Sequence, residues 1–207
     1  NFRVDNDGNH KGYTRYGEWY GNPYGDWCAM FVSFCLKYAG IDEEAIPQNA
    51  NCSDWVTNLK KMEIYEDADL YVPEAGDIVF FDQSDADRPN HVGIISEVTY
   101  GTKTVIRHIT KDGSAIESGA MNALKYINEA TSDDASGDEL RTEEVEVPVA
   151  ESIKVIEGNS SDQVQYVDYD LSNEKILGYV SLTNAKNVYE GVEEQKPVEE
   201  QKPEENK

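Results

Sequence analysis

Residues 27–40 constrain the fold of this 207-residue chain more than any other segment, because almost every side chain in them is apolar. The segment follows Asp26, a residue type that favours helix N-caps, and stops at Gly40, a residue type that favours helix ends. A helix that is apolar on all sides is stable only when it is buried. The sequence therefore predicts a helix packed inside a folded domain, with Cys28 in its first turn.

The other patterns predict what this helix packs against. Residues 1–25 are broken by Gly and Pro and are expected to form an ordered loop. A second, amphipathic helix is expected from Ser53 or Asp54 to about Met62, where apolar residues recur at helical spacing. Short apolar runs between Gly, Asn, Ser and Asp then predict strands, with a turn at Tyr100-Gly101. These strands cover residues 77–81, 91–98, 104–109, 152–157, 163–169 and 175–182.

The charge of the chain is strongly acidic. Its formal net charge is -23, and such a chain repels phosphate backbones, so no nucleic-acid partner is expected. No window approaches the roughly 18 consecutive apolar residues of a membrane span, so no transmembrane segment is expected either. The chain begins at Asn1 without a Met or a signal-peptide pattern, and we interpret it as a processed fragment, which leaves secretion open.

Cys28 and His91 have the residue types and positions of a nucleophile and a base. The N-terminus of a helix favours a thiolate through its free N–H groups and positive dipole end. A histidine can hold that thiolate as an ion pair and pass a proton to a leaving amine, and His91 opens a predicted strand. On residue type alone, a small buried thiol and an ordinary strand histidine are the favoured interpretations of Cys28 and His91.

Four passages in a fixed order resemble a known family. They are residues 16–33, 73–81, 90–95 and 156–159. Together they resemble the CHAP domain, a cysteine- and histidine-dependent amidohydrolase/peptidase of the papain-like or NlpC-type superfamily, over about residues 12–182. The resemblance implies an α+β fold in which N-terminal helices pack on an antiparallel sheet. It also implies a secreted or cell-wall-associated bacterial enzyme whose substrate is peptidoglycan.

The resemblance implies three catalytic residues. Cys28 would be the nucleophile, His91 the base, and Glu157 the acceptor that fixes the orientation of the imidazole. Glu157 lies 66 positions after His91, whereas relatives usually join these strands by a short turn. A competing alignment places Arg107 or His108 at the position of the acid, but neither accepts a hydrogen bond as a carboxylate does. We therefore expect an insertion between His91 and Glu157.

Further site positions follow from the same resemblance. Asn159 would share one side of a regular strand with Glu157. The backbone N–H of Cys28 would donate to the oxyanion, and Tyr20, in preference to Tyr24, would supply a second donor.

No cofactor is expected. The three histidines, without a Cys-x-x-Cys pair, offer no tetrahedral zinc site. Asp5 and Asp7 belong to a segment that resembles the start of a calcium loop, although its closing acidic ligand is missing at the required spacing. Calcium is therefore the one metal considered.

The three cysteines allow two arrangements. Cys35 lies seven residues after Cys28, about 10 Å along one helix, which is too far for a disulfide between them. Cys35 could instead bond to Cys52 and leave Cys28 free, or both could remain thiols.

The expected organisation is one catalytic domain between two extensions. Residues 111–152 carry 11 Asp or Glu against 3 Lys or Arg and belong to an acidic, partly disordered insertion at about 102–151, with a hairpin or helix at 121–126. Two copies of Val-Glu-Glu-Gln-Lys-Pro suggest a solvated spacer that leads to a further domain or partner. The division is an N-terminal extension at 1–11, the domain at 12–183 and a tail at 184–207.

Two classes of function remain open at this stage. The first is an amidohydrolase or endopeptidase that forms a thioester on Cys28 and cuts either the N-acetylmuramoyl-L-alanine amide or a peptide bond of peptidoglycan. The second is a catalytically silent module that binds the cell wall or a partner protein.

Overall fold

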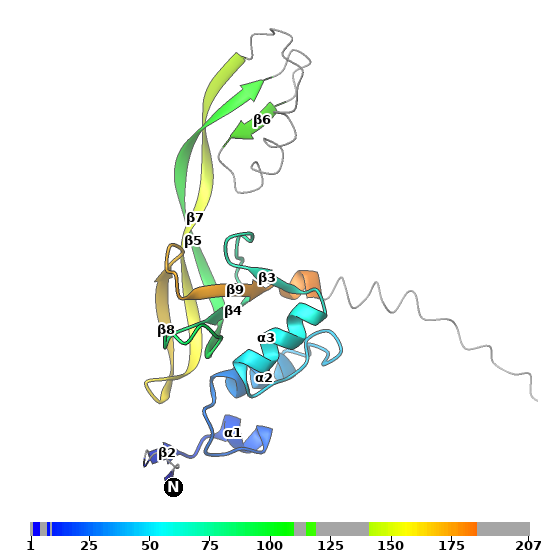
Figure 1. The fold of residues 1–207 in the computed structure, drawn as a ribbon, viewed down its shortest axis with the longest axis vertical. Helices are drawn as coiled ribbons and strands as arrows, with labels where there is room; N and C mark the ends of the chain where they lie inside the picture. Colours follow the sequence, from blue (N-terminus) through cyan, green and yellow to red (C-terminus); the bar gives the residue numbers. More distant parts are fainter. Residues whose placement is uncertain (1, 5–7, 9, 110–114, 119–140, 186–207) are drawn as a thin grey trace, which may run out of the picture.

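The structure of the chain is a computed structural model that describes residues 2–4, 8, 10–109, 115–118 and 141–185 (Figure 1). The apolar segment forms helix α2 (Cys28–Tyr38), as predicted. The helix starts one residue later than expected, because Trp27 is the N-cap. Asp26, the predicted cap, instead pairs with Lys11 at 2.7 Å between Oδ1 and Nζ.

Two further helices flank α2. Helix α3 (Cys52–Lys61) begins slightly before the predicted start, because the Asn51 side chain caps it by accepting the N–H of Asp54. Helix α1 (Arg15–Tyr20) lies where a loop was expected. It forms because the Thr14 hydroxyl accepts the N–H of Gly17 at one end, and Gly21, with a φ of 93°, ends it at the other.

The strands form one seven-stranded antiparallel sheet and a small separate hairpin. The sheet has the order β3-β9-β4-β5-β7-β8, with β6 paired to β5. Its strands are β3 (Tyr65–Asp67), β4 (Ile78–Phe81), β5 (His91–Ile109), β6 (Ala115–Ser118), β7 (Arg141–Ser160), β8 (Gln163–Asp170) and β9 (Ile176–Val180). The hairpin pairs β1 (Phe2–Val4) with β2 (His10–Gly12). Helices packed on an antiparallel sheet confirm the predicted α+β class.

The turn predicted at Tyr100-Gly101 is wrong. Strand β5 runs through this pair, with Tyr100 opposite Ala150 and Gly101 opposite Val149 on β7. A Tyr-Gly pair suggests a turn only locally, whereas here a neighbouring strand supplies hydrogen-bond partners on both sides of it. A side chain at Gly101 would also overlap the carboxyl group of Glu151.

The segment expected as an insertion lengthens strands β5 and β7. Residues 102–109 and 141–151 continue these two strands as a ribbon that leaves the body of the molecule, and β6 pairs with the β5 strand at residues 106–109 (Figure 1). The hairpin or helix expected at 121–126 lies outside the described residues, as does the tail from residue 186 onward.

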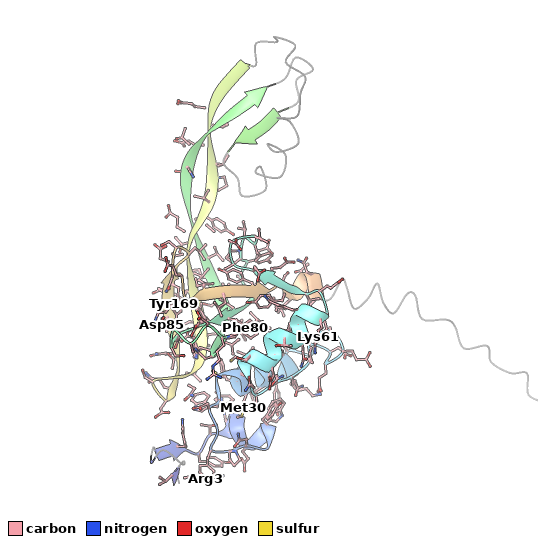
Figure 2. All side chains as sticks on the ribbon, in the orientation of Figure 1. Arg3, Met30, Lys61, Phe80, Asp85 and Tyr169 are labelled. Carbon is pink, nitrogen blue, oxygen red and sulfur yellow. The ribbon has the colours of Figure 1, made fainter. Side chains whose placement is uncertain are left out.

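Apolar side chains cover both faces of the sheet. On the helix side, α2 and α3 bury their side chains against β4 and β5. Met30 and Phe80, labelled in Figure 2, belong to this core. The ring of Trp55 meets that of Phe80 edge-on, with centroids 5.6 Å apart. A second cluster contains Phe81, Ile95 and other strand residues. Each fully buried large side chain stabilises the fold by about 1.5–3 kcal/mol.

The helix that begins at Cys28 approaches the sheet closely at one glycine. A Cβ atom at Gly158 on β7 would overlap Phe31 and lie 2.9 Å from Cζ3 of Trp27, the N-cap of α2. The absence of a side chain at residue 158 therefore sets the distance between the start of α2 and the end of β7.

We expect Gly158→Ala to lower the free energy of unfolding by about 1–3 kcal/mol, because the helix must shift to admit the methyl group. Urea denaturation at neutral pH measures this. Gly12→Ala is the matched control, since nothing lies within 4 Å of a Cβ at that position. Equal stability of the two variants would contradict the close approach of helix and sheet.

Candidate active site

Three elements bring Cys28, His91 and Glu157 together. Cys28 is the first residue of α2, and His91 is the first residue of β5. The antiparallel pairing of β5 with β7 sets Glu157 opposite Gly93, two residues from His91, so that both side chains lie on the same face. The long sequence separation between the histidine and the glutamate is thus spanned by strand pairing.

The imidazole of His91 contacts the carboxylate of Glu157. Nε2 and Oε2 lie 3.1 Å apart, and the two side chains are 8% and 0% exposed. Both atoms nevertheless lack a hydrogen bond of acceptable direction, so the contact is a close ion pair that is poorly aligned as a hydrogen bond. Catalytic hydrogen bonds are often loose before a substrate binds. With Nε2 turned to Glu157, Nδ1 is the nitrogen left for the thiol.

The thiol of Cys28 has one acceptor nearby, the backbone carbonyl of Asn90 at 3.9 Å, but its other polar contacts favour the thiolate. Its Sγ lies 3.8 Å from Sγ of Cys52. The hydrogen bond from Cys52 lowers the pKa of Cys28 most, burial opposes the change, and the contacts with His91 and the N–H of Ala29 lower it further, to about 5. The position at the start of α2 acts in the same direction. At neutral pH Cys28 is therefore a thiolate.

His91 and Glu157 are also shifted toward their charged forms. Burial opposes the charge of the imidazole, but the close contacts with Cys28 and Glu157 and their negative charges outweigh burial and raise the pKa of His91 to about 9. Burial likewise opposes ionisation of Glu157, but the contacts with His91 and Tyr169 lower its pKa below the ordinary value. The site at neutral pH thus holds a thiolate, an imidazolium and a carboxylate.

Tyr169 on β8 completes the surroundings of the carboxylate. Its hydroxyl donates to Oε1 of Glu157 at 2.6 Å and accepts from Nε2 of Gln83 at 3.2 Å. Its ring packs on Phe81 with centroids 4.6 Å apart, and Figure 2 shows its place on the sheet. The sequence analysis did not single out Tyr169, because alternation along a strand does not reveal which residue on a neighbouring strand it reaches.

The comparisons with known proteins agree with this geometry. The family model of the CHAP domain matches residues 19–108, which include Cys28, His91 and their supporting elements. Over these residues the chain is similar to a CHAP domain. CHAP domains are in general peptidoglycan hydrolases with amidase or peptidase activity, and they act on the cell wall. Neither the search of curated proteins nor that of solved structures found a match.

The region matched by the family model ends at residue 108, before Glu157, so the position of Glu157 beside His91 rests on the strand register alone. The competing residues Arg107 and His108 lie on the ribbon, paired with Glu143 and Thr142. Glu157 is the carboxylate that contacts His91.

The remaining predicted site residues make their contacts with groups other than the thiol. Asn159 has a φ of 60° at an irregularity of β7, so the regular alternation assumed for it does not hold, and its Nδ2 faces Oδ1 of Asp26 at 3.4 Å. Tyr20 is exposed at the end of α1, with its ring near Trp19. Tyr24 packs edge-on against Tyr13.

The residues that the structure describes hold no group of three or more His, Cys, Asp or Glu that could bind a metal ion. The calcium candidates Asp5 and Asp7 lie outside the described residues. Within the described part of the chain, no helix has the length and apolar character needed to cross a bilayer.

Of the two arrangements predicted for the cysteines, the disulfide between Cys35 and Cys52 is absent. All three cysteines are free thiols, and Cys52 lies against Cys28. Cys52 was noted in the sequence for its possible bond to Cys35, and only the packing of α3 against α2 reveals its contact with the nucleophile candidate.

The pH at which Cys28 becomes reactive tests this electrostatic arrangement. We expect iodoacetamide to alkylate Cys28 with a midpoint near pH 5, because its pKa is lowered to about 5. Cys35, whose pKa burial raises, should react only at alkaline pH. Peptide mass spectrometry resolves the two residues. His91→Gln should move the Cys28 midpoint upward, and an unchanged midpoint in this variant would contradict the thiolate–imidazolium pair.

Tyr169→Phe tests the support of Glu157. The variant keeps the ring on Phe81 but leaves the buried carboxylate without its donor, which costs about 1–3 kcal/mol of folding free energy. Because the pKa of Glu157 is depressed in the fold, this stability is present above pH 4.5, the ordinary value, and is lost as the pH falls through the depressed pKa. The difference in free energy of unfolding between wild type and Tyr169→Phe, measured by urea denaturation, should therefore become smaller as the pH falls below 4.5. Tyr166→Phe, at an exposed position, is the control.

Proposed function

We propose that the protein is a cysteine amidohydrolase or endopeptidase that cleaves amide bonds of bacterial peptidoglycan through a thioester on Cys28. The observation that carries the proposal is the buried line of groups formed by Cys28, His91 and Glu157, with 3.1 Å between Nε2 and Oε2. The CHAP match supplies the substrate class. A secreted or wall-associated location follows from that substrate.

The first half of the reaction uses the thiolate and the imidazolium. The Sγ atom of Cys28 attacks the carbonyl carbon of the amide, and the electron pair of the carbonyl moves to its oxygen. The tetrahedral intermediate collapses as His91 gives its proton to the leaving nitrogen, so the amine departs and a thioester remains on Cys28. Glu157 stabilises the imidazolium before this transfer and holds the ring in place.

The second half regenerates the enzyme. His91, now neutral, takes a proton from water, and the resulting hydroxide attacks the thioester. The acid product leaves with cleavage of the C–S bond, which restores the thiolate. Backbone N–H groups in the first turn of α2 have no partner within the helix and would donate to the oxyanion in both halves. The side-chain donor proposed from the sequence, Tyr20, would have to move from its exposed position to contribute.

The second candidate function is a catalytically silent module that binds the cell wall or a partner protein. Such a module would keep the fold but would not require a thiolate, an imidazolium and a carboxylate at this site. The depressed pKa of Cys28 and the ion pair between His91 and Glu157 favour the hydrolase.

Incubation with purified sacculi tests the proposal. We expect the wild-type protein to release soluble fragments, identified by mass spectrometry. New N-acetylmuramic acid ends would assign an amidase, and new amino-acid ends within the peptides would assign an endopeptidase. Cys28→Ala should lower the rate by at least about 10³-fold, because nothing else in the line of groups can form the acyl-enzyme.

Two further variants give the controls. Cys35→Ala removes a thiol from the same helix and should leave the rate unchanged. Glu157→Gln keeps the shape of the side chain but not its charge, and should lower the rate by about 10²-fold or more. Release of no fragment by the folded wild-type protein from sacculi of several wall chemistries would reject the hydrolase in favour of the silent module.

A further inference from the structure

Two thiols face each other at the starts of two packed helices. Cys28 is the first residue of α2 and Cys52 is the first residue of α3. Their Sγ atoms lie 3.8 Å apart, and the residues are 7% and 5% exposed. The amidohydrolase mechanism uses only one of these thiols. Among the described residues, Cys52 is the cysteine in contact with Cys28, while Cys35 lies seven residues along α2.

We propose that Cys28 and Cys52 form a redox pair, in which a peroxide oxidises Cys28 and Cys52 then closes a disulfide that is reversed by thiol reductants. The sulfur atoms need to approach by roughly 1.8 Å to reach the bond length of a disulfide. We expect rotation about the side-chain bonds of the two cysteines to bring the sulfur atoms to this distance. Cys52 is thus assigned as a resolving cysteine.

The chemistry balances with hydrogen peroxide as the oxidant. The thiolate of Cys28 attacks one peroxide oxygen, the O–O bond breaks, and Cys28 becomes a sulfenic acid while hydroxide leaves. The sulfur of Cys52 then attacks the sulfenyl sulfur of Cys28. The S–S bond forms and the S–O bond breaks, and the departing hydroxide combines with the proton of Cys52 as water. Two thiols are oxidised and one peroxide is reduced.

The charges around the pair favour this order of events. The contact with Cys52 lowers the pKa of Cys28 most, burial opposes this change, and the contacts with His91 lower the pKa further. Cys28 is therefore the thiolate that attacks the peroxide. The hydrogen bond to Cys28, burial and the negative charge of Cys28 raise the pKa of Cys52, so Cys52 stays protonated at first. Once Cys28 is a neutral sulfenic acid, that charge is gone, and the start of α3 favours ionisation of Cys52.

The pair would also protect the nucleophile. A sulfenic acid without a nearby thiol is oxidised further to sulfinic acid, which ordinary reductants do not reverse. A disulfide stops the oxidation at a recoverable stage. This consequence for activity rests on the proposed function, because Cys28 in a disulfide cannot form a thioester. The disulfide chemistry itself does not depend on the hydrolase.

Peroxide treatment of the purified full chain tests the inference. We expect a slight excess of hydrogen peroxide to lower the number of free thiols per chain from three to one, as counted by alkylation and intact mass. Peptide mapping without reduction should find Cys28 joined to Cys52 and Cys35 alkylated, and dithiothreitol should restore three thiols. Mapping that finds sulfinic acid on Cys28 with Cys52 still free would overturn the inference, as would a bond to Cys35.

Matched variants separate the role of Cys52 from its packing. Cys52→Ser keeps a small donor beside Cys28, and its Cys28 should reach sulfinic acid at a peroxide dose that leaves the wild type fully reducible. Cys35→Ala should behave as wild type. Circular dichroism and thermal melting confirm that each variant is folded. Equal recovery of Cys28 as a thiol in Cys52→Ser and wild type would overturn the resolving role.

Fragment release from sacculi then distinguishes the two proposals. Peroxide should lower the rate by at least about tenfold, and dithiothreitol should restore it in wild type but not in Cys52→Ser. A reversible disulfide in a protein that never releases fragments would reject the hydrolase and keep the redox pair. Fragment release by a protein that forms no disulfide after peroxide treatment would keep the hydrolase and reject the redox pair.

Discussion

The antiparallel pairing of β5 with β7 is the constraint on which the rest of the structure depends. It places Glu157 opposite Gly93 and hence beside His91, although long stretches of chain separate them. The same strands form the surface on which α2 packs, and Gly158, the residue after Glu157, admits the helix N-terminus. The nucleophile candidate, the imidazole and the carboxylate are therefore positioned by one pair of strands and by the helix that rests on it.

The site holds charge in a buried place by surrounding it with donors. A thiolate and a carboxylate lie on either side of one imidazolium, so one negative charge remains in excess. Burial of an unpaired charge costs several kcal/mol, and hydrogen bonds are the means by which proteins offset it. Tyr169 donates to Glu157. Cys52 and the backbone N–H of Ala29 donate to Cys28. The reactive form of the thiol thus depends on residues outside the line of three groups.

Much of the fold could be predicted from the sequence. The apolar run gave α2, and short apolar runs gave the central strands, because burial leaves a direct trace in residue type. The positions of Cys28 and His91 at the starts of a helix and a strand follow from the same patterns. The choice of Glu157 required resemblance to a family, since nothing in the residues themselves states which distant strand lies next to β5.

The parts that could not be predicted depend on tertiary pairing. Tyr100-Gly101 is a turn signal in isolation, and only the presence of β7 alongside makes it part of a strand. The alternation argument for Asn159 fails because β7 is irregular at its end. The contacts of Tyr169 with Glu157 and of Cys52 with Cys28 join elements far apart in sequence, and no local pattern records such contacts.

The ribbon formed by residues 102–109 and 141–151 has a consequence for how such a chain can vary in length. Two shifts in the register of β5 and β7, near Ser96 and Glu151, separate the ribbon from the pair formed by Gly93 and Glu157. Residues added in equal number to both of its strands would lengthen the arm without changing which residue faces Gly93. The number of residues between His91 and Glu157 can therefore change during evolution. The pairing of Glu157 with Gly93 at the base of the arm must stay the same.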